Sequence, residues 1–428
     1  MEHPKNFPAL LFADGEGNIR EFTDLEVVGM SNGNFIRPAL EDWIPMPEGS
    51  DLFTLPGRLP VGWDPHSGEP VLLTENPYEA GKPVQAVAAF MAPAHTAIFS
   101  SSYQTQPGAP TLPLFAYTAV GWYLDSFWVT GFRSDIDKRQ DADQYRQADV
   151  TKRTRKKLQQ FKDNRLIQHL GKCCLTYGCP AARNYFLGRW EAPLPTSPSC
   201  NARCLGCISL QASGCCPSTQ DRITFVPSVG EISQIAISHL DTAENPIVSF
   251  GQGCEGEPLL QADVIEKAIQ RIRSKTSRGT INLNSNSSLP VSVKRLAVAG
   301  LDSIRVSLNS AQQDCYNLYF RPTNYSFSDV MKSIDVMKES GRFVSLNYFV
   351  LPGFTDSIQE FEAFCTLIRR HHPNFIQLRN LNMDPEWYQQ SLALSKETQT
   401  LGISQWFDMV QKEFPALRFG YFNPQVNP

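Results

Sequence analysis

The feature that most constrains the fold is an alternation that begins at residue 191. Short apolar, β-branched runs alternate there with segments of helical period, which is typical of β-α units on a parallel sheet. The expected strands are residues 191–196, 247–251, 280–284, 303–309, 343–351 and 375–379. Residues 263–275, 327–339 and 358–370 each place apolar side chains on one helical face. Six strands are fewer than the eight of a closed (β/α)8 barrel.

The region before this alternation has a different character. Residues 1–135 are rich in Phe, Tyr, Trp, Pro and Gly, and their apolar runs are strand-like. Asp14-Gly15-Glu16-Gly17-Asn18 lies between two such runs and predicts a hairpin. We therefore predict a β-rich N-terminal domain at 1–135, a charged helical linker with cysteines at 136–190, and an α/β core with a C-terminal extension at 191–428.

The overall charge of the chain argues against a general attraction to nucleic acid or to membranes. The net charge is −4, so no global basic field attracts nucleic acid or an anionic membrane. A local basic stretch is formed by Lys152, Arg153, Arg155, Lys156, Lys157, Lys162 and Arg165. A solvated linker helix is the favoured interpretation of this stretch, because base stacking needs aromatic side chains spread among the charges. RNA or an acidic peptide is the alternative, and nucleic acid is therefore not our expected partner.

The chain is expected to be cytoplasmic and to have no membrane span. Its first 18 residues lack the basic region and apolar run of a secretory signal. Residues 112–132 are apolar, but Pro113 and Asp125 within them favour buried strands over a membrane-spanning helix.

Cysteine clustering is the strongest functional signal. Eight of the 11 cysteines lie within 44 residues, and a cytoplasmic chain of this size has no need of disulfides. Cys200, Cys204 and Cys207 share an eight-residue loop that contains no histidine. A structural zinc site usually has four protein ligands, whereas three thiolates suit a 4Fe-4S cluster with one open iron.

The spacing Cys-x3-Cys-x2-Cys after a strand-like segment resembles that of the radical SAM superfamily. The resemblance implies a partial (β/α)6 TIM-like barrel with its site at the carboxyl ends of the strands. It also implies a 4Fe-4S cluster and S-adenosylmethionine as cofactors, cleavage to a 5′-deoxyadenosyl radical, and a low-potential electron donor such as a ferredoxin or flavodoxin.

Further resemblances lie where the later strands end. They imply S-adenosylmethionine contacts from Gly256, Glu257 and Pro258 to the methionyl amino group, from Asn286, from Ser307 and Asn309 to the ribose, from Arg321 to the methionyl carboxylate, and from Leu351 to adenine. Ser287 stands where the family has Gly. Ordinary turns and a solvated surface arginine are the alternatives. On the sixth strand, Gln377 and Arg379 either close the pocket floor or pair with buried polar neighbours.

The other cysteines leave alternatives open. An auxiliary Fe-S cluster is one interpretation of Cys173, Cys174, Cys179, Cys215 and Cys216, and unligated thiols are the other. Cys254 is a candidate catalytic thiol or a packing residue. Cys315 and Cys365 are expected in the core.

The sequence does not identify the substrate. A peptide or protein is preferred, because an extra β domain and additional cysteines suit a large substrate; RNA and small metabolites stay open. The rival class is a non-enzymatic protein in which the cysteines hold zinc or an electron-transfer cluster.

Overall fold

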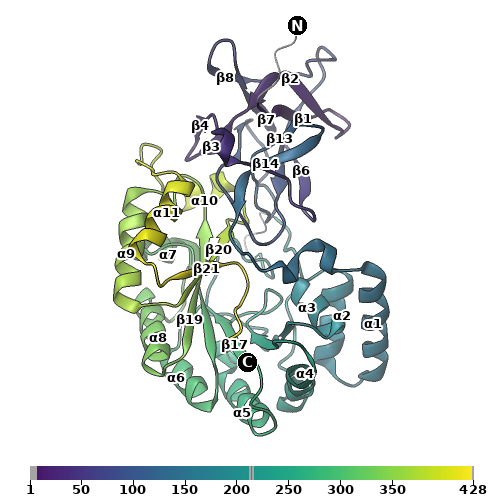
Figure 1. Ribbon diagram of the computed structural model, residues 1–428, viewed down its shortest axis with the longest axis vertical. Coiled ribbons are helices and arrows are strands. Elements are labelled where there is room, and N and C mark those ends of the chain that lie inside the picture. The colour runs from purple at the N-terminus through teal and green to yellow at the C-terminus, as the bar shows by residue number, and fades with distance from the viewer. Residues whose placement is uncertain (1–6, 212–213, 215, 427–428) are drawn as a thin grey trace. The chain divides into compact units, whose positions relative to one another are not determined.

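The computed structural model describes residues 7–211, 214 and 216–426 (Figure 1). The chain divides into two units. One comprises Met1–Ile136, Phe349–Glu362 and Leu378–Phe414, and the other comprises Asp137–Tyr348, Ala363–Gln377 and Pro415–Pro428. The domain boundaries at residues 135 and 190 stay a prediction.

The first unit is β-rich, as predicted for the N-terminal region. Its strands are β1 (Ala9–Ala13), β2 (Ile19–Val27), β3 (Gly29–Ser31), β4 (Asn34–Ile36), β5 (Trp43–Pro45), β6 (Asp51–Leu55), β7 (Arg58–Asp64), β8 (Glu69–Leu72), β9 (Gln85–Phe90), β10 (His95–Ala97), β11 (Ser100–Ser101), β12 (Tyr103–Thr105), β13 (Val120–Tyr123) and β14 (Ser126–Arg133). The large sheet runs β10-β14-β13-β1-β2-β7-β12, and β5, β6, β8 and β9 pair at its sides. A small sheet runs β11-β3-β4.

Local chemistry explains the first hairpin. Ala13 pairs with Ile19, and the carboxylate of Asp14 accepts the N–H groups of Glu16 and Asn18 at 3.0 and 2.9 Å. Such an Asx turn reverses the chain where the sequence predicted it. The unit also contains α10 (Pro385–Ser391) and α11 (Ile403–Glu413), and Asp384 before α10 forms a buried ion pair with Arg58 at 2.9 Å.

The second unit is built on a curled parallel sheet in the order β15-β16-β17-β18-β19-β20-β21. These strands are β15 (Glu191–Pro193), β16 (Ile247–Phe250), β17 (Thr280–Ser285), β18 (Ser303–Leu308), β19 (Phe343–Val350), β20 (Phe375–Asn380) and β21 (Arg418–Gly420). The helices that follow them are α4 (Val229–Thr242), α5 (Ala262–Arg273), α6 (Pro290–Ala299), α7 (Gln313–Phe320), α8 (Phe327–Glu339) and α9 (Ile358–His371). The last residues of β19 and β20 are counted with the first unit. This is the predicted partial TIM-like barrel.

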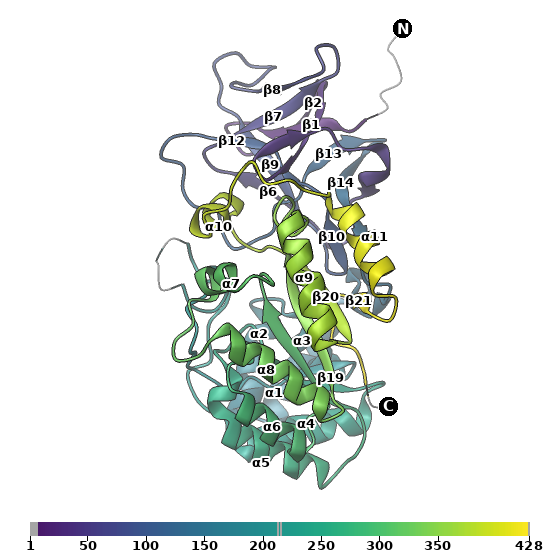
Figure 2. The same cartoon turned by 90° about the vertical axis from the view of Figure 1, so that its left-hand side faces the viewer.

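The two faces of this sheet differ in polarity. Ile281, Leu283, Ile304, Val306 and Leu346 are buried on one face, where the helices pack (Figure 2). The opposite face is polar. Because strand side chains alternate with period two, this pattern fixes which face curls around the barrel interior.

Polar side chains on the interior face form hydrogen bonds from strand to strand. Asn282 of β17 donates to Ser249 of β16 at 3.2 Å and accepts from Ser303 of β18 at 2.8 Å. On the other side, Gln377 of β20 accepts from Arg305 at 3.2 Å and donates to Asn423 at 2.9 Å. Gln377 therefore has buried polar partners, one of its two predicted roles.

The structure adds a strand that the sequence did not predict. β21 pairs in parallel with β20, with Phe375 opposite Arg418. Three residues carry too little periodicity to be recognised as a strand. Conversely, β15 ends at Pro193 rather than at residue 196, because the chain turns there toward the cysteine loop.

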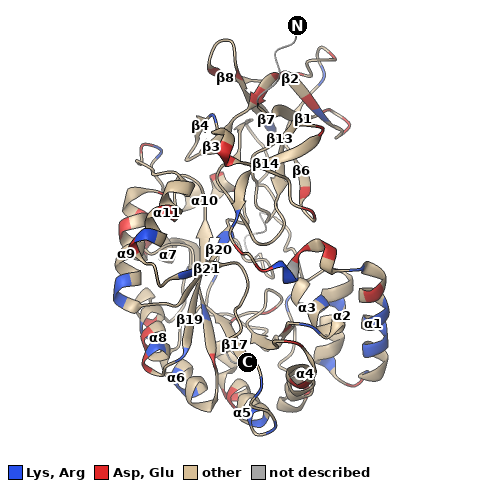
Figure 3. Ribbon diagram, viewed as in Figure 1, with Lys and Arg blue, Asp and Glu red and all other residues tan. Residues whose placement is uncertain are grey.

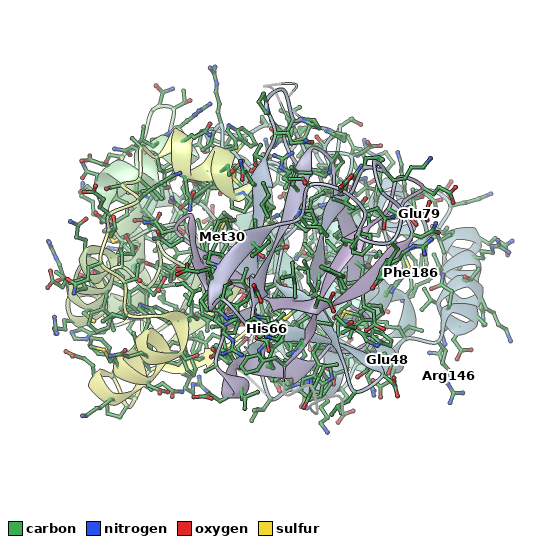
Figure 4. All side chains as sticks on the ribbon, turned by 90° about the horizontal axis from the view of Figure 1, so that it is seen from above. Met30, Glu48, His66, Glu79, Arg146 and Phe186 are labelled. Atoms are coloured by element: carbon green, nitrogen blue, oxygen red, sulfur yellow. The ribbon has the colours of Figure 1, made fainter. Side chains whose placement is uncertain are left out.

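Three helices precede the sheet in the second unit: α1 (Gln147–Gln160), α2 (Arg165–Leu175) and α3 (Pro180–Leu187). The basic stretch lies largely on α1, and Figure 3 shows its charges along that helix. Arg146, which precedes α1, is exposed and points outward (Figure 4). The buried Val150 and Thr154 lie on the opposite side, so α1 is an amphipathic helix packed on its neighbours. Among the described residues, no helix is long and apolar enough to cross a membrane.

Candidate functional site

The three-cysteine loop follows β15, and Cys200, Cys204 and Cys207 are half-buried. Backbone hydrogen bonds attach the loop to the end of α7. Arg203 N–H donates to Phe320 O at 2.9 Å, and Leu205 N–H donates to Tyr319 O at 3.0 Å. The loop is thus held by its main chain, which leaves the thiols free for a ligand.

Electrostatic effects link the thiols of the loop. Burial raises the pKa of Cys200 to about 11 and raises that of Cys204 well above its usual range, and the neighbouring thiols raise the pKa of Cys204 further. Partly buried thiols that affect one another in this way suit ligation to iron, because the metal supplies the positive charge that a thiolate needs. The donor set therefore fits a 4Fe-4S cluster.

Arg222 lies beside the cysteine loop, and the sequence did not predict this contact. Arg222 Nη2 lies 3.4 Å from Cys207 Sγ, and its Nε donates to Ser209 Oγ at 3.1 Å. Hydrogen bonds and positive charge at a ligating sulfur raise the reduction potential of a cluster. A basic residue 15 positions after Cys207 is too weak a signal to be found from the sequence.

The Gly256-Glu257-Pro258 segment lies against the residues that lead into the loop. Gly256 N–H donates to Ser197 O at 2.7 Å, and Glu257 N–H donates to Ser199 O at 2.9 Å. A Cβ on Gly256 would lie 2.0 Å from Ser199 O, so only glycine permits this approach. The sequence-predicted Gly-Glu-Pro motif and the cysteine loop therefore meet through their backbones.

The Glu257 carboxylate is directed at the end of β17. It accepts hydrogen bonds from Ser285 Oγ at 2.6 Å, Asn286 N–H at 2.9 Å and Leu259 N–H at 3.0 Å. Burial raises its pKa to about 7. Glu257 thus joins two strand ends; its predicted contact with the methionyl amino group stays a prediction.

Asn286 reaches the loop directly. Its Nδ2 donates to Asn201 Oδ1 at 2.8 Å, and Asn201 Nδ2 donates to Ser288 Oγ at 2.9 Å. Ser287 has φ of 57°, the left-handed conformation that glycine adopts most easily. Ser287 thus adopts a backbone conformation for which glycine is the usual residue. The contact between Asn201 and Asn286 was not predicted from the sequence, although Asn201 lies between two predicted ligands.

The remaining predicted cofactor residues are placed as follows. Ser307 is half-buried at the carboxyl end of β18, and the buried Asn309 donates to Cys315 O at 3.1 Å. Arg321 caps the end of α7 and is exposed, while its neighbour Thr323 donates its N–H to Asn201 O at 2.8 Å. Leu351 belongs to the first unit. The roles of these residues stay predictions.

Glu255 is a buried carboxylate that the sequence did not reveal. One oxygen accepts the N–H groups of Thr196 and Ser197 at 2.7 and 2.9 Å, and the other accepts those of Gly251 and Gln252 at 2.7 and 2.8 Å. Burial raises its pKa. Glu255 therefore joins the chain that enters the cysteine loop to the chain that leaves β16.

The four described cysteines of the proposed auxiliary set have different surroundings. Cys173 lies beside His169 and Cys254, whereas Cys174 lies 3.3 Å from Thr154 of α1. Cys216 is buried, and Cys215 lies outside the described residues. A hydrogen bond from Cys254 lowers the pKa of Cys173; the same contact, together with burial, raises the pKa of Cys254. Cys254 is thus paired with Cys173, and its suggested catalytic role stays a prediction.

Comparison with known proteins agrees with this geometry. Residues 194–367 match the model of the Radical SAM superfamily. A GTP 3′,8-cyclase of Marinobacter nauticus is 26% identical over 169 residues, which are 38% of this chain and 46% of that protein. A mitochondrial GTP 3′,8-cyclase of Arabidopsis thaliana is 25% identical over 224 residues, 51% of each chain. The chain thus spans about half the length of these curated relatives. Among solved structures, a radical SAM methyltransferase from Sphaerobacter thermophilus matches with a TM-score of 0.37 and 17% identity, over 54% of this chain and 66% of that one.

Proposed function

We propose that this chain, whose residues 194–367 match the Radical SAM superfamily model, is an enzyme that cleaves S-adenosylmethionine reductively. Cys200, Cys204 and Cys207 would hold a 4Fe-4S cluster through three of its irons. When bound, the cluster supplies the electron that cleaves the sulfonium to methionine and a 5′-deoxyadenosyl radical, which takes a hydrogen atom from the substrate. A ferredoxin or flavodoxin is the proposed electron donor.

One observation carries the proposal. Two segments far from the loop in the sequence, at 256–257 and 286–288, are joined by direct hydrogen bonds to the cysteine loop or to its approach at 197–199. These contacts between the three predicted motifs support the binding of a single cofactor by all of them. A closed metal site that only stabilised the fold would need a fourth protein ligand. It would not need the other two motifs to contact the cysteine loop.

The residues of the chain have distinct tasks in this proposal. The main chain at Gly256 and Glu257 holds the methionyl end of the cofactor beside the thiols. Ser307, at the carboxyl end of β18, and Asn309, just after it, are the proposed contacts to the ribose hydroxyls. The barrel walls exclude water. This exclusion prevents side reactions, so that the carbon radical reacts only with its substrate.

The substrate is proposed to be polar. The interior face presents the side chains of Ser249, Asn282, Ser303, Arg305 and Gln377, from four different strands. Polar groups in a binding site fix the orientation of a substrate through hydrogen bonds. A peptide or protein is the first candidate for the substrate, because the additional β-rich unit suits a large partner. The relatives named as GTP cyclases make a nucleotide the second candidate, and Arg305 is a suitable partner for an anionic group.

Anaerobic reconstitution tests the proposal. The protein is loaded with iron and sulfide, reduced with dithionite and incubated with S-adenosylmethionine, and 5′-deoxyadenosine is measured by chromatography. We expect about four irons at the loop and product formation, both lost in Cys204→Ala. Cys365→Ala, in α9, is the matched control and should keep both. Failure to form 5′-deoxyadenosine above the Cys204→Ala background contradicts the proposal and favours a non-enzymatic Fe-S or zinc protein.

A separate experiment addresses the substrate. Extracts from cells with and without the protein are compared for modified peptides, and fractions are added to the reduced enzyme. Isotope exchange from deuterated substrate into 5′-deoxyadenosine identifies the hydrogen donor. Exchange from a nucleotide fraction and not from peptides refutes the peptide assignment while leaving the radical chemistry intact.

A further inference from the structure

A second group of potential metal ligands lies apart from the three-cysteine loop. His169 and Cys173 are one helical turn apart on α2, and Cys254 lies in the loop after β16. The Nε2 or Nδ1 atom of the histidine and the two sulfur atoms all lie within 4.8 Å of one another. Cys173 and Cys254 are buried, and His169 is half-buried.

The separation of these atoms matches a single tetrahedral ion. Zinc bonds of about 2.3 Å to sulfur and about 2.0 Å to nitrogen, at the tetrahedral angle, place the two ligand atoms about 3.6 Å apart. Cys173 Sγ and His169 Nε2 are 3.6 Å apart. The thiols of a 4Fe-4S cluster each bind a different iron, so they stand farther apart than ligands that share one ion.

A third thiol is close to this group. Cys179 caps the start of α3, and its N–H donates to Cys173 O at 3.1 Å, which closes the turn between α2 and α3. Cys179 therefore adjoins Cys173 through the main chain. One histidine and three cysteines are a common ligand set of structural zinc.

We propose that His169, Cys173, Cys179 and Cys254 bind one zinc ion, separately from the radical site. Binding releases the thiol protons to solvent and needs no oxidant or reductant. Soft thiolate and imidazole ligands in tetrahedral geometry select zinc over the hard cations. This assignment is an alternative to the auxiliary iron–sulfur cluster and the unligated thiols that the sequence left open, and it does not depend on the proposed radical reaction.

The position of Cys254 gives the ion a structural role. Cys254 directly precedes Glu255, which binds four backbone N–H groups, and Gly256, which contacts the approach to the cysteine loop. The ion would therefore anchor this loop to α2. Such a link reduces the freedom of the segment that borders the cofactor site.

Metal analysis of the full-length protein tests the inference. The protein is purified from zinc-supplemented medium, and zinc and iron are counted by mass spectrometry. We expect about one zinc per chain, reduced at least fivefold in Cys173→Ser and in Cys254→Ser. Cys174→Ser is the matched control: it changes the next residue of α2, which contacts Thr154 instead, and should keep its zinc. Cys204→Ala should lose iron and keep zinc, so failure of the radical proposal is distinguishable.

Co²⁺ binding by the wild-type protein tests the site without depending on whether a variant folds. After zinc is removed by a chelator, Co²⁺ is titrated in, and intense visible bands of tetrahedral thiolate coordination are expected. Cys179→Ser should weaken Co²⁺ binding at least tenfold. Absence of those bands overturns the site, as does a Cys173–Cys254 disulfide detected by mass, or a second set of four irons lost in Cys254→Ser. Unchanged Co²⁺ affinity in Cys179→Ser overturns the four-ligand assignment.

Discussion

Replacing Gly256 by alanine tests whether the close approach of the Gly-Glu-Pro segment to the cysteine loop is essential. The added Cβ would lie 2.0 Å from Ser199 O, and no real Cβ approaches below 3.0 Å. The two segments must therefore separate by about 1 Å, a displacement of the size that over-packing of a core produces. That movement breaks or stretches two hydrogen bonds, Gly256 N–H to Ser197 O and Glu257 N–H to Ser199 O.

The magnitude follows from these two effects. Over-packing costs about 1 to 3 kcal/mol, and each backbone hydrogen bond contributes about 0.5 to 1.5 kcal/mol. The middle of the summed range is a cost of about 4 kcal/mol. If the cofactor binds only when the two segments return to the wild-type geometry, this cost opposes binding. If three quarters of it appears in binding, the affinity for S-adenosylmethionine falls about 100-fold, since 1.4 kcal/mol is tenfold.

Equilibrium dialysis of the reconstituted protein against labelled S-adenosylmethionine measures this loss. Gly230→Ala is the matched control, because its Cβ would meet only Ser228 Oγ at 3.7 Å and it lies in the first turn of α4. The control should bind the cofactor as the wild type does. Binding by Gly256→Ala within threefold of the wild type, with full iron content, would refute the reasoning.

Two further predictions concern buried ionisable groups. In Glu255→Gln the new amide N–H₂ faces two backbone donors, so we expect about 2 to 5 kcal/mol of destabilisation in urea unfolding. The control Glu244→Gln, at an exposed position, should change the free energy of unfolding by less than about 0.5 kcal/mol. Equal effects of the two substitutions would contradict the role of Glu255. Burial lowers the pKa of His239 to about 4, and its Nε2–H donates to Trp190 O at 2.7 Å. Because the unfolded chain takes up a proton below pH 6.5 that the folded chain refuses, stability falls as pH drops toward 4, by about 2 to 3 kcal/mol at pH 4.5. His239→Gln should remove that part of the pH dependence in apo-protein unfolding between pH 7 and 4.5; an unchanged slope would show that His239 is not its source.

Much of the second unit was predictable because its elements have strong periodicity. The helix expected at 327–339 is α8 (Phe327–Glu339), where Ser326 and Asp329 form a capping box and apolar residues follow the helical period. Five of the expected strands begin where the structure begins them and end within one or two residues, since β-branched runs buried on a parallel sheet are distinctive. β21 was missed because a three-residue edge strand depends on its partner, which the local sequence does not contain.

The candidate site was only partly predictable. Ligand spacing identified the cysteine loop, because its three thiols are sequence neighbours. Arg222 contacts the loop and Glu255 contacts its approach through tertiary structure, and Asn201 within the loop is reached in the same way by Asn286. Cys173 and Cys174 are equivalent in a sequence, yet successive residues of a helix point about 100° apart, and only Cys173 faces Cys254. The i, i+4 pair His169 and Cys173 was the available signal, because residues four apart share one helix face.

Main-chain contacts hold the cysteine loop in place. Arg203, Leu205, Gly256 and Glu257 all use backbone N–H groups in the contacts that position the loop. Backbone contacts do not depend on side-chain identity, so most of these positions tolerate substitution. Two kinds of position are different. A glycine is needed where a Cβ would collide, as at Gly256, and a carboxylate is needed where it collects several N–H groups. The residues just before Gly256 include both a carboxylate of this kind, Glu255, and Cys254. They support the approach to the loop, so substitutions there should affect stability and cofactor affinity together.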